Sequence, residues 1–154
     1  MLFVVNCDFN SQKMRFLFYL LFLSICLACS KSNVDNENCR FLLNVGVNVP
    51  VNLNLPEYGN LQSPGNSVYI PNAGNAGIIV ANIGFAYMAW DASDPNHPPS
   101  TCSALTVSGL EGTCGCDDNT YSLVTGQALE NGTLRCSLKN YRIEQSGNTL
   151  LITN

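Results

Sequence analysis

Apolar and polar residues alternate over residues 43–55, where the sequence reads LNVGVNVPVNLNL. Every odd position is apolar and every even position is Asn, Gly or Pro. This period of two fits a strand with one face on a core, and a helix has no use for it. Pro50 belongs to the outward set, which predicts an edge strand or a bulge at that point.

Short strands separated by turn residues are predicted along the rest of the chain. Residues 56–66, PEYGNLQSPGN, have the Pro, Gly and Asn density of a loop. No helical period of useful length follows residue 29, so we predict an all-β fold, a small antiparallel sandwich or barrel of about eight to ten strands. Strands are expected within 67–71, 77–82, 85–92, 104–109 and 120–126, and a terminal hairpin within 138–154.

The first 28 residues have the layout of a secretory signal. Arg15 precedes an apolar run from Phe16 to Ala28, which is too short for a permanent membrane helix. A buried core helix is disfavoured because the run has no polar face. A start at Met14 would keep the signal complete. The ending CLAC resembles a bacterial lipobox, which implies cleavage before Cys29 and lipidation of that cysteine.

A flexible tether is predicted between this anchor and the folded body. Residues 29–39 are polar, aperiodic and rich in turn formers, and the β-domain is expected over residues 40–154. The chain is therefore predicted to be anchored by lipid to a membrane of the bacterial cell envelope, facing the periplasm or the cell exterior.

Charge and motifs exclude several function classes. From Cys29 onward the chain has five Lys and Arg against ten Asp and Glu, a net charge of about −5. The absence of a basic stripe argues against nucleic acid as a partner. The sequence contains no P-loop, no G-x-G-x-x-G before a helix and no metalloprotease helix.

Five cysteines remain in the expected mature chain besides Cys29. In an oxidising compartment pairs of cysteines are expected to form disulfides, and an odd number leaves one as a thiol or a ligand. The five are Cys39, Cys102, Cys114, Cys116 and Cys136.

The order of the pieces after residue 68 resembles the cluster-binding part of a Rieske iron–sulfur domain. A strand YMAWDA precedes a loop with His97 and Cys102, then come GTCGCDDNTYSL and TGQ…NG…LKNYRIE…GNTLLIT. The layout, with SDPNHPP in the first loop, is also similar to Rieske-like lipoproteins of the Bacteroidetes type. In that family the loops read C-x-H-x-G-C and C-P-C-H-G-S; the earlier Cys of each and both His bind the irons, and the later Cys of each form a disulfide.

Matching the second loop to this pattern places Cys114 on the ligand cysteine, Cys116 on the disulfide cysteine and Asp117 on the second histidine. In the first loop Cys102 falls on the disulfide cysteine. His97 falls on the first histidine only with two inserted residues, which puts Pro95 on the first ligand cysteine.

The resemblance thus implies a Cys102–Cys116 disulfide. Cys102–Cys114 is the chief rival, because a one-residue spacing lets either thiol reach. Parity alone then pairs Cys39 with Cys136.

Two of the four cluster ligands are missing from this match. A Rieske cluster needs two thiolates and two neutral imidazoles; proline offers no ligand atom, and aspartate offers a hard oxygen. The first hypothesis is a degenerate [2Fe–2S] site without cofactor, in a structural or interaction module that binds an envelope protein and is not an enzyme.

Two further hypotheses stay open. One is an electron-transfer protein that binds a [2Fe–2S] cluster through an altered ligand set, such as His97, Cys114 and Asp117, or through a partner's residue. The other is a thiol–disulfide redox protein that uses Cys114 and Cys116 with Cys102.

Each candidate residue also has a purely structural interpretation. His97 can be a turn residue. Flanking Asp117 and Asp118 would raise the pKa of the Cys114 thiol, which favours an inert or disulfide-bonded cysteine. Asp117, Asp118 and Asn119 can hold a cation weakly or simply form a polar loop tip.

Overall fold

The computed structural model describes residues 39–129 and 134–154. The described residues belong to the compact unit Asp35–Asn154. The predicted signal and the lipidation of Cys29 lie outside the described residues and stay predictions. Within the described ranges, no helix is long and apolar enough to span a membrane.

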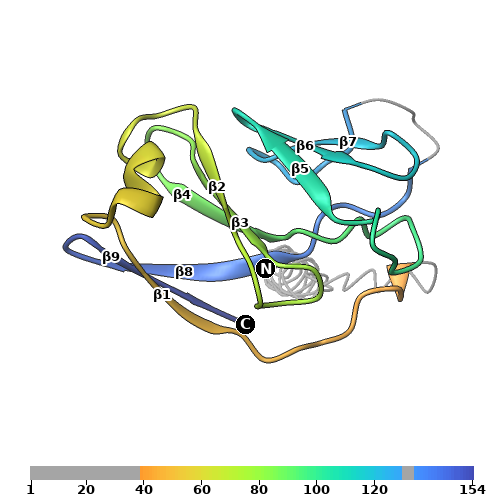
Figure 1. The fold of residues 1–154 in the computed structure, drawn as a ribbon, viewed down its shortest axis with the longest axis horizontal. Coiled ribbons are helices and arrows are strands. Elements are labelled where there is room, and N and C mark those ends of the chain that lie inside the picture. The colour runs from red at the N-terminus through yellow and green to blue at the C-terminus, as the bar shows by residue number, and fades with distance from the viewer. Residues whose placement is uncertain (1–38, 130–133) are drawn as a thin grey trace, which may run out of the picture. The chain divides into compact units, whose positions relative to one another are not determined.

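The described chain is built from nine strands in two antiparallel sheets (Figure 1). The larger sheet has six strands in the order β1-β9-β8-β4-β3-β2, and the smaller has three in the order β5-β6-β7. The predicted all-β fold is confirmed. The elements are β1 Asn48–Asn52, the 3-10 helix η2 Pro56–Gln62, β2 Ser67–Ile70, β3 Ile78–Asn82, β4 Tyr87–Asp91, β5 Leu105–Ser108, β6 Glu111–Cys114, β7 Thr120–Ser122, β8 Asn140–Ser146 and β9 Thr149–Thr153.

The alternating segment near the start of the body forms strand β1, which pairs only with β9. Val51 and Leu53 are buried, as the period of two predicts, while Pro50 is exposed. The edge position predicted from Pro50 is therefore confirmed. The strand is shorter than the alternation because pairing with β9 ends at Asn52, and Leu43 and Leu55 are exposed beyond it.

Two elements differ from the sequence-based expectation. Residues 56–62 form η2 instead of an open loop: Pro56 starts the helix, and Leu61 is fully buried, which gives the turn an apolar anchor. Strand β6 was expected to be loop. Its sequence EGTC has no apolar alternation, but Gly112 and Cys114 face the core.

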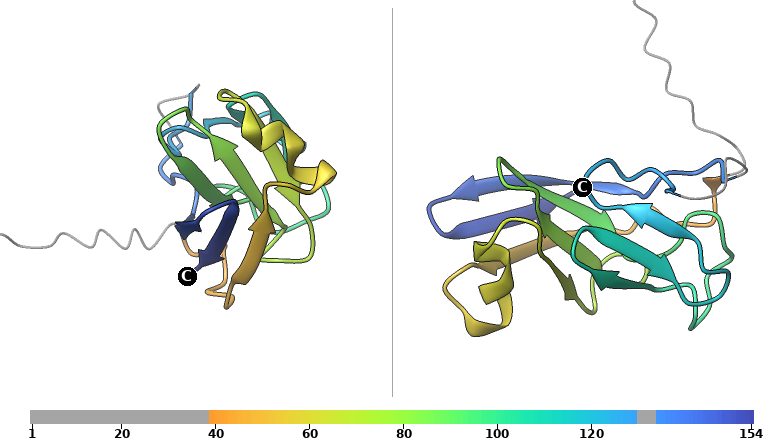
Figure 2. Two further views of the ribbon diagram at one scale, coloured as in Figure 1. Left: turned by 90° about the vertical axis from the view of Figure 1, so that its left-hand side faces the viewer. Right: turned by 90° about the horizontal axis from the view of Figure 1, so that it is seen from above.

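The apolar residues form two core clusters. One is made by residues of β1, β2, β3, β4, β8 and β9 together with Val47, Leu53 and Leu61. The other lies where β3 and β4 meet the smaller sheet, around Trp90 and Tyr121. Figure 2 shows the smaller sheet beside the β3–β4 part of the larger one in two more views. Residues of the candidate site, Cys114 and Cys116, pack in this second cluster.

The Trp90 indole fixes the segment after β7 against β4. Its Nε1 donates to the Leu123 carbonyl at 2.8 Å. Gly126 has φ +74° and lies so close to the indole that an added Cβ would be 2.6 Å from the ring. Any larger residue at position 126 would push the smaller sheet away from Trp90.

Candidate functional site

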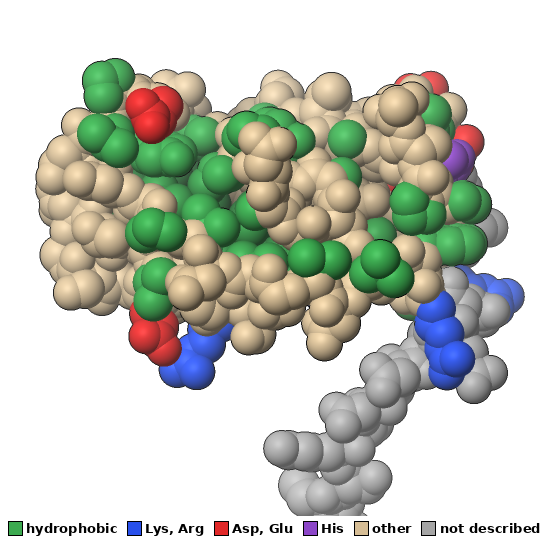
Figure 3. All heavy atoms as spheres, turned by 60° about the horizontal axis from the view of Figure 1, so that its bottom comes forward, with side chains coloured by type: hydrophobic (Ala, Val, Ile, Leu, Met, Phe, Trp, Pro, Cys, Tyr) green, Lys and Arg blue, Asp and Glu red, His purple; other side chains and the backbone are tan. Residues whose placement is uncertain are grey.

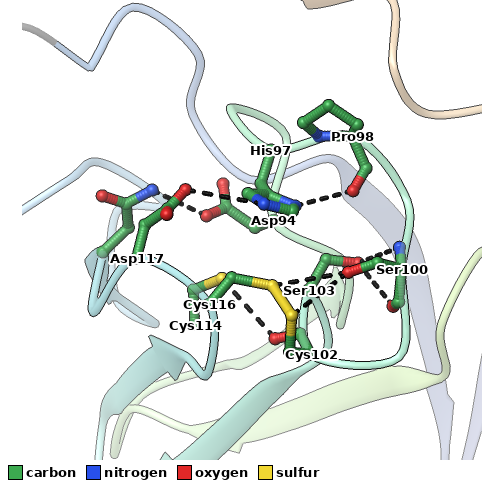
Figure 4. Close-up of a disulfide and its surroundings, with 10 residues drawn as sticks. Asp94, His97, Pro98, Ser100, Cys102, Ser103, Cys114, Cys116 and Asp117 are labelled. Carbon is green, nitrogen blue, oxygen red and sulfur yellow. Dashed lines mark hydrogen bonds and ion pairs between the residues drawn. A yellow bond between two sulfur atoms is a disulfide. The ribbon is translucent and has the colours of Figure 1, made fainter.

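Two loops form the candidate site at one end of the smaller sheet (Figure 4). The first runs from the end of β4 to the start of β5, and the second is the turn between β6 and β7. The Cys102–Cys116 disulfide joins them, with a Cα–Cα distance of 5.0 Å. The predicted pairing is confirmed, and the rival Cys102–Cys114 pairing is wrong. The Ser100 hydroxyl lies 3.3 Å from the Cys102 sulfur and 3.4 Å from the Cys116 sulfur.

A second disulfide joins the start of the described chain to the segment before β8. Cys39 and Cys136 are bonded with a Cα–Cα distance of 5.5 Å, as parity predicts. Cys136 is buried beside the first loop. This bond fixes the point where the chain enters the body next to the candidate site.

Cys114 is the free cysteine among the described residues, and it is fully buried at the end of β6. Burial raises the pKa of its thiol above the ordinary value. Backbone N–H groups of Cys116 and Asp117 act in the opposite direction, and Asp94 raises the pKa further through a hydrogen bond and its charge. The net effect keeps Cys114 as a neutral thiol at neutral pH, which suits packing better than nucleophilic or redox chemistry.

A buried carboxylate lies between the loops. Asp94 is fully buried, and Oδ1 accepts hydrogen bonds from the Tyr121 hydroxyl at 2.5 Å and the Asn96 backbone N–H at 2.8 Å. Oδ2 accepts from Asn119 Nδ2 at 2.8 Å. The three donors come from the first loop, the second loop and β7, so one side chain connects all three.

Asn96 extends this network to the segment that carries the second disulfide. Its Nδ2 donates to the Tyr121 hydroxyl at 2.8 Å and to the Cys136 carbonyl at 2.7 Å. Its Oδ1 accepts from the backbone N–H groups of Cys136 and Arg135. Burial, more than the hydrogen bond to Asp94, raises the pKa of Tyr121 far above the ordinary range. The hydroxyl is therefore a stable donor.

His97 and Asp117 meet at the surface above the disulfide. His97 Nε2 lies 3.7 Å from Asp117 Oδ2, and Figure 4 shows the two side chains pointing toward each other. His97 Nδ1 lies 2.6 Å from the Pro98 carbonyl oxygen. In Figure 3 the chain's single histidine, in purple, is at the surface beside acidic side chains in red. The residues matched to the two cluster histidines are thus brought together.

Asp94 is the residue that the sequence analysis missed. The match put Pro95 at the first ligand position, and Pro95 is buried, but the acidic group that acts on Cys114 belongs to Asp94. An aspartate whose carboxylate accepts the N–H two residues later is a common turn element, so the local turn could be predicted. Its bonds to Asn119 and Tyr121, 25 and 27 residues away, have no sequence signal.

The side chains at this site that could bind a metal do not fit a [2Fe–2S] cluster. Such a cluster takes four thiolate or imidazole ligands, whereas the loops offer one thiol, Cys114, one imidazole, His97, and three carboxylates. Asp94 is committed to three hydrogen bonds. Across residues 39–129 and 134–154, no three His, Cys, Asp or Glu side chains are placed to hold one metal ion.

Comparison with known proteins finds likeness only in solved structures. No protein-family model matches the chain, and no curated protein matches it in sequence. The ferredoxin of carbazole 1,9a-dioxygenase from Nocardioides aromaticivorans IC177 is 14% identical, with 70% of this chain and 96% of that chain covered and a TM-score of 0.44. The ferredoxin of Sphingomonas yanoikuyae B1 is 15% identical, with 60% and 88% covered and a TM-score of 0.44.

A third similar structure is a complex of reduced oxygenase and oxidized ferredoxin in carbazole 1,9a-dioxygenase. The matched chain is 15% identical, with 72% of this chain and 94% of that chain covered and a TM-score of 0.47.

Proposed function

We propose that this protein is an exported, lipid-anchored β-domain with a degenerate [2Fe–2S] site, which acts as a structural or interaction module in the cell envelope. The observation that carries the proposal is the Asp94 network. Between the disulfide-bonded loops, where a Rieske-like site needs a thiolate opposite Cys114, the chain has a carboxylate whose oxygens are already paired with Tyr121, Asn96 and Asn119.

The Asp94 network and the Cys102–Cys116 disulfide together fix the loops relative to each other, which a bound cluster would otherwise do. The disulfide links the loops covalently, and the buried carboxylate satisfies donors from both of them. Buried hydrogen bonds to a charged group are worth about 1.5–3 kcal/mol each, so the loops keep one conformation without a metal. A fixed, exposed loop pair is a suitable docking surface for a protein partner, because little conformational entropy is lost when it binds.

The alternative is an electron-transfer protein with a [2Fe–2S] cluster held by His97, Cys114 and Asp117 or by a partner's residue. The thiol–disulfide alternative has less support, since Cys114 is buried and its pKa is raised. Reduction of the Cys102–Cys116 bond by a mild dithiol, with Cys114 forming a new disulfide, would restore that alternative.

Iron analysis separates the proposed cluster-free module from the electron-transfer alternative. The full chain would be produced together with cluster-assembly machinery, purified from membranes in detergent, and analysed for iron, acid-labile sulfide, and visible and EPR spectra after dithionite reduction. The proposal predicts a colourless, folded protein with iron and sulfide far below stoichiometry. Near-stoichiometric iron and sulfide with a [2Fe–2S] spectrum would make the chain an electron carrier.

The anchor has its own test. Mass spectrometry of the membrane-purified chain is expected to find a lipid-modified N-terminal residue at Cys29, and Cys29→Ser is expected to release the body into the soluble fraction. An unmodified Cys29 in a membrane-bound chain, or an unchanged distribution of the variant, would contradict lipid anchoring.

A further inference from the structure

The start of the described chain is fixed at the end of the body that carries the candidate site. Cys39 is bonded to Cys136, whose carbonyl accepts a hydrogen bond from Asn96 of the first loop at 2.7 Å. In Figures 1 and 2 the orange start of the described chain lies at the same end as the β4–β5 and β6–β7 loops. An anchor at Cys29 is ten residues before Cys39, and ten residues span at most about 36 Å. A membrane that holds the anchor is therefore within this distance of the disulfide.

Positive charge gathers at this end of the body. Arg40 and Arg135 are exposed and are adjacent to the two bonded cysteines, and Lys139 follows three residues after the second cysteine. Residues 29–43 and 134–139 together have four Lys and Arg against two Asp and Glu, a net charge of +2. The rest of the expected mature chain has one against eight, a net charge of −7. An anionic surface therefore attracts this end and repels the rest of the body.

Two exposed apolar side chains lie beside these cations. Phe41 is 40% exposed and Leu43 is 70% exposed. The backbone under them is fixed, because the Leu43 N–H donates to Asn75 Oδ1 at 2.8 Å and the Leu43 carbonyl accepts from Asn75 Nδ2 at 3.1 Å and from Lys139 Nζ at 2.7 Å. Apolar side chains next to Lys and Arg are typical of surfaces that lie among lipid headgroups. We call this set the anchor-end patch: Arg40, Phe41, Leu43, Arg135 and Lys139.

The patch is separate from the acidic tip of the candidate site. In Figure 3 the blue side chains at the right-hand end of the body lie along its lower edge, whereas the purple histidine and the red side chains near it lie at the upper edge. Among the described residues, Arg142 is the cation outside the patch, and it pairs with Glu144 at 2.9 Å. The patch can therefore lie on a membrane while the loop pair stays accessible to a partner.

We infer that the anchor-end patch rests on anionic lipid headgroups of the membrane that holds the lipid anchor. The inference deepens the proposed function and depends on its lipid anchor. A short linker raises the effective concentration of a tethered surface to about the millimolar range, so weak contacts are enough to keep the patch on the bilayer. Acyl chains and basic patches act together in this way in membrane attachment.

The test places the membrane-purified full chain in nanodiscs that contain a lipid with a spin-labelled headgroup. One set of discs is made of phosphatidylcholine, and the other of an equal mixture of phosphatidylcholine and phosphatidylglycerol. The amide NMR signals of Phe41 and Leu43 are expected to lose at least about threefold more intensity in the anionic discs. The difference should disappear in about 1 M salt, where the screening length is about 3 Å. The signal of Gly147, in the β8–β9 turn, should be the same in both discs.

Two arginine variants make the test specific. Arg135→Gln is expected to reduce the difference between the discs by about half. Arg142→Gln removes the same charge from another exposed arginine and is expected to leave the difference unchanged. Equal reduction by the two variants would overturn the inference, because it would show attraction by net charge alone.

Failure of the inference and failure of the anchor give different results. Equal loss of the Phe41 and Leu43 signals in both discs, with Cys29 lipidated, would overturn the inference alone and would leave an acidic protein surface as the occupant of the patch. A chain that is incorporated into neither kind of disc would contradict the lipid anchor of the proposed function, and the inference with it.

Discussion

Two buried aspartates, three residues apart, have the same chemistry in different surroundings. Asp91 and Asp94 are both fully buried, and each accepts a hydrogen bond of 2.5 Å from a tyrosine, Tyr141 for Asp91 and Tyr121 for Asp94. Asp91 ends a central strand of the six-stranded sheet, whereas Asp94 lies in the loop that follows.

The network of Asp91 is supported by the sheet and its turns. Asp91 Oδ2 also accepts from the backbone N–H and the side-chain amide of Asn75, and Oδ1 accepts from the Ser93 N–H. The adjacent turn needs Gly74, with φ +66°, because a Cβ there would lie 2.8 Å from the Asp91 carboxylate. Strand pairing holds these residues without a covalent link.

The network of Asp94 lies mostly in loops, with strand pairing at Tyr121 of β7, and it is bracketed by two disulfides. Cys102–Cys116 joins its loops, and Cys39–Cys136 holds the segment bound by Asn96. Asp91 thus lies within paired strands, whereas the same kind of group at Asp94 lies between two disulfides. The backbone amides of Asn75 and Asn96 are matched probes of this difference by hydrogen exchange, since each donates to one of the two aspartates.

Removal of the Cys39–Cys136 disulfide is expected to have the largest effect. Its cysteines are 97 residues apart, for which chain entropy gives about 4.7 kcal/mol. Denaturant unfolding of Cys39→Ser/Cys136→Ser should show a loss of this order, and exchange at Asn96 should accelerate more than at Asn75. Equal acceleration at both amides would mean that this disulfide supports the whole body and not the loop network.

Removal of the Cys102–Cys116 disulfide is expected to cost about 3 kcal/mol, since its loop is close to 15 residues. The variant is Cys102→Ser/Cys116→Ser. Cys114→Ser, at a cysteine that is not disulfide-bonded, controls for the effect of replacing a cysteine by serine. Exchange at Asn96 should rise and exchange at Asn75 should stay near the native rate. Unchanged exchange at Asn96 would show that the Asp94 network holds the loops without the disulfide.

Asparagine substitutions compare the two carboxylates directly. Asp91→Asn should lower the free energy of unfolding by about 1–3 kcal/mol, because both oxygens accept from donors and an amide NH₂ would oppose one of them. Asp94→Asn should cost about 1 kcal/mol less, since the Asn119 amide can turn to present its oxygen. Chemical denaturation measures both, and a larger loss for Asp94→Asn would reverse the comparison.

Removal of the two tyrosine hydroxyls is expected to have the smallest effect on the free energy of unfolding and to change its pH dependence. Burial, and secondarily the neighbouring aspartate, raises the pKa of both Tyr121 and Tyr141. Their contribution to stability is therefore complete below the unfolded pKa of about 10 and is lost as the pH rises through the higher folded values. Tyr121→Phe and Tyr141→Phe should each cost about 1 kcal/mol at pH 7 and flatten the alkaline loss in unfolding experiments. An unchanged alkaline slope in both variants would contradict this assignment.

Most strands were predictable from local sequence patterns, whereas the cysteine pairing came from the family resemblance and from parity. The period of two over residues 43–55 follows from the pleat of β1, and SGN between two alternating segments predicted the β8–β9 hairpin, which is confirmed. Strand β6 was missed because a glycine and a cysteine fill its inward positions, which gives no apolar alternation.

The hydrogen bonds inside the site could not be predicted from the sequence, because they join residues that are far apart along the chain. The spacing of Cys114, Cys116 and Asp117 located the second loop, but the bonds from Tyr121 and Asn119 to Asp94 depend on how the loops fold together. The N–H of Asn96, two residues after Asp94, marks only a local turn. The motif match thus predicted the disulfide that joins the two loops, and only the structure identified the carboxylate that lies between them.

The central claim is that the Asp94 carboxylate, through Tyr121, holds the loop pair together. A double-mutant cycle of Asp94→Ala and Tyr121→Phe, with denaturant unfolding of the four proteins, measures this coupling directly. Residues in one buried network show interaction energies of about 0.5–3 kcal/mol, and this account predicts at least about 1 kcal/mol. Additive losses would contradict it.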